Sequence, residues 1–73
     1  MLMNLTVYRI DGLMKEEVII KINPALVISL EPLLGGTRIV TVGKSYLSPL
    51  PLAVIEGHIE REHTRSLYDV KLN

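Results

Sequence analysis

The segment Gly43-Lys44-Ser45 contains the residue types that bind phosphate at the end of a P-loop. A P-loop also requires a glycine five positions before Gly43, where this chain has Arg38, and an open loop whose backbone amides surround the phosphates. Residues 39–42 are instead all β-branched, which is typical of a strand. We therefore interpret the segment as a hairpin turn with a polar tip.

Two histidines, His58 and His63, are candidate metal ligands. On a regular helix, residues five positions apart point about 140° away from each other, so these two cannot hold one ion. His58 and Glu62 do share a helix face, but two ligands fall short of the four that a structural metal site uses. The sequence therefore predicts no metal site.

General acid–base catalysis requires carboxylates held in an apolar cleft. The acidic residues of this chain fall in loops or on the polar side of predicted elements, and a chain of this length has little volume for such a cleft. We therefore expect no catalytic residues, no cofactor and no enzymatic activity. The acidic residues considered are Glu16, Glu17, Glu31, Glu56, Glu60, Glu62 and Asp69.

Tyrosines on strands can stack on nucleobases when basic side chains surround them. Tyr8 and Tyr46, with Arg9, Arg38 and Lys44, are the candidates for such a nucleic-acid-binding face. The alternative is that the tyrosines pack at the edge of the core with their hydroxyls in water. We favour this alternative because a phosphate-binding surface is usually basic, whereas eight basic and eight acidic residues cancel here.

The length and composition indicate one small domain that needs support. The chain has 73 residues, 48% of them hydrophobic, and contains no Phe, Trp or Cys. Its core must be aliphatic, and no disulfide can strengthen it. Part of this apolar supply is expected to remain exposed unless another chain covers it. We therefore expect a protein partner or a homo-oligomer.

The chain has no apolar run long enough to span a membrane, and its start lacks the pattern of a signal peptide. We expect no association with membranes and a cytoplasmic location. Nucleic acid stays open as a partner, but is not favoured.

Alternating β-branched and aliphatic residues predict a sheet over residues 5–47. Residues 5–10 and 17–22 predict two strands, and Asp11-Gly12 is a hairpin turn signal. Asn23-Pro24 interrupts the pattern with a turn or a single helical turn. Further strands are expected at residues 26–31, ended by Pro32, at residues 37–42 after Gly35-Gly36, and at residues 45–47.

A helix is predicted over residues 49–62. Ser48 is a suitable N-cap, and proline is tolerated in the first turn. Leu52, Ile55 and Ile59 follow at helical spacing and are expected to face the sheet. Residues 64–73 are predicted to be a tail or a final strand.

Several of these features occur together in one known family. The segments in question are Asp11-Gly12, Ile22-Asn23-Pro24-Ala25-Leu26-Val27, Leu30-Glu31, Thr37 to Ile39, Gly43-Lys44-Ser45-Tyr46, and Val54-Ile55 with Ile59. In this pattern the chain resembles the small FlbD-type proteins of bacterial flagellar operons and similar short phage-encoded proteins. The resemblance covers residues 5 to about 60. It implies the same fold and a bacterial or phage origin, and it implies no catalytic residues.

Taken together, the sequence predicts a single domain, residues 1–73, of the mainly β (α+β) class. A small antiparallel sheet of four to five strands would carry one short C-terminal helix packed on it. The predicted function is that of a small non-enzymatic protein-interaction module of bacterial or phage type. The alternative is a small nucleic-acid-binding regulator that uses a β face with Tyr and Arg or Lys.

Overall fold

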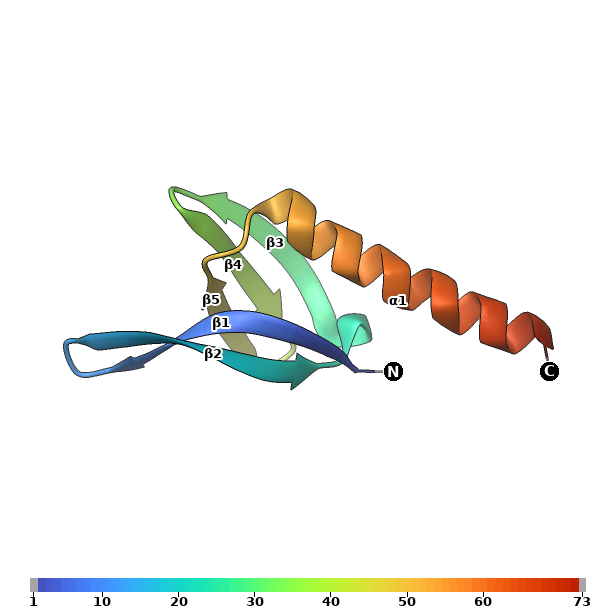
Figure 1. The fold of residues 1–73 in the computed structure, drawn as a ribbon, viewed down its shortest axis with the longest axis horizontal. Coiled ribbons are helices and arrows are strands. Elements are labelled where there is room, and N and C mark those ends of the chain that lie inside the picture. Colours follow the sequence, from blue (N-terminus) through green and yellow to red (C-terminus); the bar gives the residue numbers. More distant parts are fainter. Residues whose placement is uncertain (1, 73) are drawn as a thin grey trace.

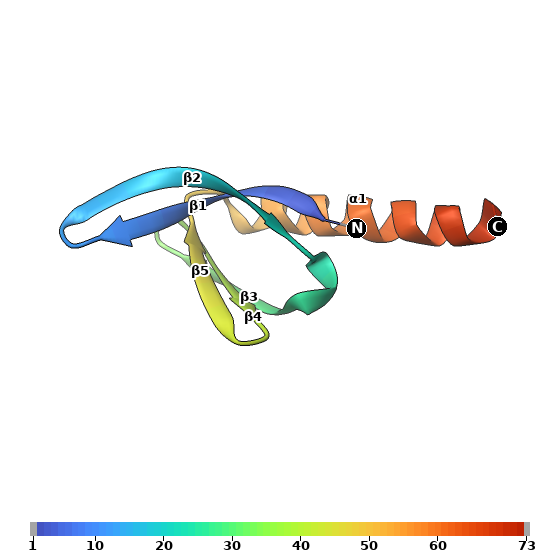
Figure 2. The same cartoon turned by 90° about the horizontal axis from the view of Figure 1, so that it is seen from below.

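The computed structural model describes residues 2–72, and the side chains of residues 2–62. It confirms the mainly β, α+β class with a C-terminal helix. The strands are divided between two antiparallel sheets, of order β1-β2 and β3-β4-β5, which lie across one another (Figures 1 and 2). The elements are β1 (Met3–Asp11), β2 (Met14–Ile22), η1 (Pro24–Leu26), β3 (Val27–Leu33), β4 (Gly36–Thr41), β5 (Lys44–Ser48) and α1 (Leu52–Leu72).

Strands β1 and β2 form a long hairpin with an uninterrupted register from Met3 opposite Ile22 to Asp11 opposite Met14. The predicted turn is confirmed: Gly12 has a φ of 61°. A positive φ at the first of two turn residues is characteristic of a type II′ hairpin, whose twist suits the flanking strands. The second strand begins at Met14, directly after the tight turn, and so includes residues before the predicted range of 17–22.

The predicted interruption at Asn23-Pro24 is the short helical turn η1, capped by the Asn23 side chain, which accepts a hydrogen bond from the Ala25 amide at 2.9 Å. A register shift between Val27 and Ser29 follows in β3. This bulge changes which residues face inward: Val27 packs against the core, while Ile28 is 65% exposed. The strand predicted from residue 26 is present as β3, but it begins at Val27, and the bulge interrupts its alternation.

Strand β3 also continues past Pro32, which was expected to end it, and reaches Leu33. Pro32 is tolerated there because β3 is an edge strand. An N–H at this position would point to the open side of the sheet, where no strand could accept it. Gly36 then begins β4 against the backbone of β5. A Cβ at Gly36 would lie 2.0 Å from the Ser48 carbonyl oxygen, so this close approach requires glycine.

The core lies between the two sheets and the start of α1. Half-buried Val18, Ile20, Val27, Leu30, Tyr46, Leu50 and Ile59 surround it. It is entirely aliphatic apart from one methionine, as the composition requires. The buried apolar residues are Met3, Leu5, Val7, Ile22, Ile39 and Ile55.

A polar contact joins the two sheets at Ser48. The Ser48 hydroxyl donates to the Thr6 carbonyl at 2.6 Å and accepts from the Leu50 amide at 3.1 Å. Nearby, the Thr37 hydroxyl donates to the Leu50 carbonyl at 2.9 Å. We call the contact made by Ser48, Thr6 and Leu50 the serine clasp. It links β1 to β5 without a strand ladder between them.

The predicted use of Ser48 as a helix N-cap is wrong, because the amide that its hydroxyl accepts from, Leu50, lies before the helix and not in its first turn. The helix begins later, at Leu52, where the Pro51 carbonyl accepts the amides of Val54 and Ile55. The inward face is confirmed at Ile55, which is buried, and Ile59, which packs against the core.

The helix also extends further than the predicted range of 49–62, to Leu72. Residues 64–72 are helical, so the prediction of a final strand is wrong there; Asn73 lies outside the described residues. Extending an existing helix adds one hydrogen bond for each residue fixed, whereas a new strand would need a partner. Within the part of the chain that the structure describes, no helix has the length and apolarity needed to cross a membrane.

Candidate functional site

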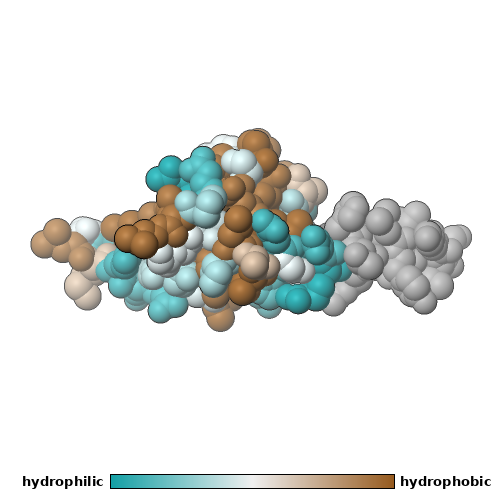
Figure 3. Space-filling model, turned by 90° about the horizontal axis from the view of Figure 1, so that it is seen from above, coloured by the Kyte–Doolittle hydropathy of each residue, from teal (hydrophilic) through white to brown (hydrophobic). Residues whose placement is uncertain are grey.

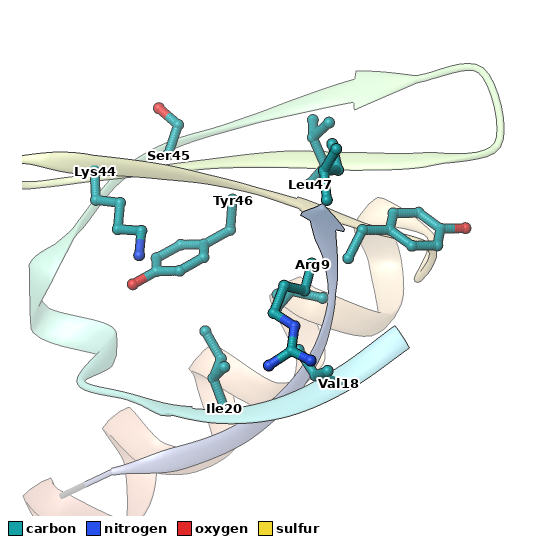
Figure 4. A pocket seen from close by; sticks show the side chains of 10 residues that line it. Arg9, Val18, Ile20, Lys44, Ser45, Tyr46 and Leu47 are labelled. Carbon is teal, nitrogen blue, oxygen red and sulfur yellow. The ribbon is translucent and has the colours of Figure 1, made fainter. Parts of the chain in front are cut away.

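A groove with a volume of about 440 Å³ lies between the β1–β2 hairpin and β5. Its walls are mainly apolar, and the period-two alternation of β2 directs both Val18 and Ile20 toward it. Figure 4 shows Tyr46 and Lys44 projecting from β5 on one side and Ile20 on the other, while Ser45 points away. The lining residues are Val7, Tyr8, Arg9, Ile10, Val18, Ile20, Lys44, Ser45, Tyr46 and Leu47.

Two lysines at the edges of this region lie over tyrosine rings. The Lys44 ammonium is 5.1 Å from the centre of the Tyr46 ring, and the Lys15 ammonium is 4.4 Å from the centre of the Tyr8 ring. Both distances are within the range of cation–π attraction. These contacts hold the tyrosine faces against lysine, which leaves less of each ring open to a stacked base.

Both arginines of the predicted nucleic-acid face are paired with carboxylates. Arg9 forms an ion pair with Glu16 across the β1–β2 hairpin. Arg38 forms one with Glu31 across β3 and β4, at 3.1 Å. Both pairs are exposed, so each adds little stability, but each places a negative charge beside the positive one.

The structure brings together four of the five predicted nucleic-acid-binding residues. Tyr8, Arg9, Lys44 and Tyr46 all line the groove. Arg38 does not, because it lies on the opposite face of β4 from its buried neighbours. The predicted face is therefore a smaller cluster than the sequence suggested, and one of its two positive charges, that of Arg9, is offset by Glu16.

The end of the β1–β2 hairpin reaches beyond the rest of the fold (Figure 1). We call residues 9–17 the hairpin arm. Every residue of the arm is exposed, on both faces of the ribbon. Three of its side chains are large and apolar: Ile10 is 62% exposed, Leu13 105% and Met14 74%. The arm is thus an ordered strand pair without a core beneath it.

Large apolar side chains are more often exposed than buried in this chain. Among the residues with described side chains, eleven are exposed and six form the core. Figure 3 shows apolar surface at the hairpin end and in further patches over the middle of the molecule, separated by hydrophilic side chains. Single exposed apolar residues are normal in soluble proteins, whereas apolar residues that gather in an exposed patch mark interaction sites.

Among the described side chains, no group of three potential metal ligands lies close together. His58 already has a neighbour, since its Nδ1 lies 2.6 Å from the guanidinium of Arg61 and can accept a hydrogen bond from it. The Gly43-Lys44-Ser45 motif forms a hairpin turn and the start of β5, with Gly43 at a φ of 85°. The interpretation of this motif as a turn is confirmed.

Comparison with known protein families, characterised proteins and solved structures finds no match to this chain. The resemblance to FlbD-type proteins therefore stays a prediction.

Sequence reasoning did not single out the hairpin arm. One signal was present: Leu13-Met14 directly follows Asp11-Gly12, where turns usually carry polar residues. Both residues are exposed in the structure, at 105% for Leu13 and 74% for Met14.

Proposed function

We propose that this chain is a small, non-enzymatic protein-interaction module of bacterial or phage type that acts in the cytoplasm. The observation that carries the proposal is the hairpin arm, in which Ile10, Leu13 and Met14 are exposed beyond the core. The resemblance to FlbD-type proteins supports the origin. The arm supports the mode of action.

A two-stranded ribbon is only marginally stable in water on its own. The arm nevertheless continues the hairpin with full register and no break from Arg9 opposite Glu16 to the turn. Its apolar tip gains free energy only when another surface covers it, at roughly 25 cal/mol per Å² of buried apolar area. A protein partner that accepts the tip would supply that burial.

The test compares two leucines that are equally exposed at two hairpin tips. Leu13, in the arm, is 105% exposed, and Leu34, between β3 and β4, is 107% exposed. Tagged wild-type protein, Leu13→Ser and Leu34→Ser would be used to capture proteins from a lysate of the source cell, with quantitative mass spectrometry. Leu13→Ser should lose the specific partner, and Leu34→Ser should keep it.

Because both leucines are solvent-exposed, each substitution should change stability by no more than about 0.5 kcal/mol. A urea unfolding curve for each variant checks this. The proposal fails if wild-type protein enriches nothing above an unrelated control, or if both variants lose the partner equally.

A second candidate function is binding of single-stranded nucleic acid at the groove. It is favoured by the convergence of Tyr8, Arg9, Lys44 and Tyr46 there. It is weakened by the ion pair between Arg9 and Glu16 and by the neutral net charge. A lysine also lies over each tyrosine ring, which leaves less of the ring open to a stacked base.

A fluorescence titration with single- and double-stranded oligonucleotides at two salt concentrations tests this candidate. If it is correct, affinity falls as salt rises. Lys44→Ala, at the groove, should then weaken binding, and Arg38→Ala, on the other face of β4, should not. Absence of binding at low salt rejects the candidate.

A further inference from the structure

Strand β2 has one paired edge and one free edge. Across nine residues it pairs with β1, and within the described residues no strand pairs with its other side. Proteins usually protect such an edge with proline, a bulge or charged side chains. The free edge of β3 has a bulge after Val27 and a proline at position 32. Strand β2 has neither, and its charged side chains are of both signs: Lys15 and Lys21, and Glu16 and Glu17.

The hairpin geometry fixes which residues of β2 present their backbone to the free edge. In a two-residue hairpin, the pair that flanks the turn, here Asp11 and Met14, is hydrogen-bonded, and bonded pairs then alternate with non-bonded ones. Glu17, Ile19 and Lys21 therefore direct their N–H and C=O groups outward. Thr6, opposite Ile19, follows the same rule, because its carbonyl points away from β2 to Ser48.

We propose that the free edge of β2 pairs antiparallel with β2 of a second copy, with Ile19 opposite Ile19 across a two-fold axis. This inference rests on the proposed function in one respect, that the module binds protein. It concerns a different surface, the β2 edge, and the partner proposed for that surface is a second copy of the chain.

Charge complementarity selects this register. With Ile19 at the axis, Glu17 of each copy lies opposite Lys21 of the other, which forms two cross-strand ion pairs. Moving the axis by one residue to Val18 would place Lys15 opposite Lys21 twice. Like charges directly opposite each other on neighbouring strands are destabilising, and opposite charges are stabilising. The charges of β2 thus disfavour the neighbouring register while favouring this one.

The side chains at the axis fit the same arrangement. Ile19 is 73% exposed on the outer face of the hairpin, and pairing would cover it with its own copy. On the inner face, Val18 would lie opposite Ile20 of the second copy. Both residues are half-buried and line the groove, so the apolar linings of the two grooves would meet.

A disulfide test reads the register directly, because the chain has no cysteine. In the proposed pair the two Ile19 Cα atoms would be roughly 5.5 Å apart, within reach of a disulfide. Ile19→Cys should therefore form a covalent dimer under mild oxidation. Val18→Cys is the matched control: its Cα atoms would be diagonal neighbours, roughly 7–8 Å apart, and should cross-link poorly.

A charge exchange tests the pairing without a cross-link. Within one chain Glu17 lies opposite Tyr8 and Lys21 opposite Asn4, so neither charge has the other as its cross-strand neighbour. Glu17→Lys should weaken the dimer about 10-fold in sedimentation velocity experiments. Adding Lys21→Glu to that variant should restore the wild-type affinity, because both ion pairs re-form with reversed polarity.

The outcomes separate this proposal from the proposed function. Any one of three results overturns pairing at the β2 edge. They are a wild-type protein that stays monomeric over a 100-fold range of concentration, a Val18→Cys variant that cross-links better than Ile19→Cys, and a dimer whose affinity Glu17→Lys does not change. If the protein is monomeric but Leu13→Ser still abolishes capture of its partner, the proposed function stands and the dimer is rejected. If the protein dimerises but no partner depends on Leu13, the dimer stands and the proposed function is rejected.

Discussion

Replacement of Ser48 by alanine should weaken the contact between the two sheets. We expect it to lower the free energy of unfolding more than the loss of any other single hydroxyl in the described structure. The Ser48 side chain is 2% exposed and connects Thr6 of β1 to Leu50, after β5. Alanine would remove both hydrogen bonds and leave the Thr6 carbonyl and the Leu50 amide without this partner. Neither group belongs to the ladder between β1 and β2.

The magnitude follows from the cost of an unsatisfied buried polar group, which is about 1–3 kcal/mol. With two groups affected and some relaxation, we expect Ser48→Ala to lower the free energy of unfolding by roughly 2–4 kcal/mol. A domain of this length has a total stability of roughly 4–11 kcal/mol, at 0.05–0.15 kcal/mol per residue. The serine clasp would therefore account for a substantial part of the whole.

The assay is urea unfolding followed by circular dichroism. With a slope of about 1 kcal/mol per M urea, the midpoint should fall by about 2 M or more without a change in slope. Ser45→Ala is the matched control, since Ser45 lies on the same strand, is exposed and points away from the groove (Figure 4). Equal midpoints for Ser48→Ala and Ser45→Ala would refute the role of the clasp.

Two further substitutions test the packing around the clasp and along the helix. Gly36→Ala should destabilise the fold by roughly 1–3 kcal/mol or more, because its Cβ would lie 2.0 Å from the Ser48 carbonyl oxygen; an unchanged urea midpoint would contradict that contact. Gly57→Ala should instead stabilise α1 by about 0.5–1 kcal/mol, since the new methyl group would meet only the Arg61 guanidinium at 3.9 Å, and a lower melting temperature would contradict this.

The local signals in the sequence predicted the elements well. Alternation of aliphatic residues placed the β1–β2 hairpin, and the Asp11-Gly12 turn was identified because glycine supplies the positive φ that a tight hairpin needs. The proline break before β3 was also recognised. These features depend on residues close in sequence, where steric preference and period are readable.

The features that sequence could not predict depend on distant contacts. The bulge after Val27 reverses the facing of the next residues, and it is set by the pairing with β4. Ser48 has the residue type of a helix cap, but its hydroxyl bonds Thr6, 42 residues away. Similarly, the tyrosines and basic residues of the groove were proposed as one face, and only the fold reveals that Arg38 lies on the other side.

Stability and association are linked in a chain with so few buried side chains. If β2 pairs with a second copy, binding to the native state raises the free energy of unfolding by mass action. Unfolding midpoints would then increase with protein concentration in the wild type and in Ser48→Ala alike, because the clasp faces β5 and the paired edge faces outward. In Glu17→Lys the midpoint would depend less on concentration. The serine clasp and the free edge of β2 lie on opposite sides of the β1–β2 hairpin. Measuring the unfolding midpoint at several protein concentrations can therefore distinguish stability lost at the clasp from stability gained by pairing at the edge.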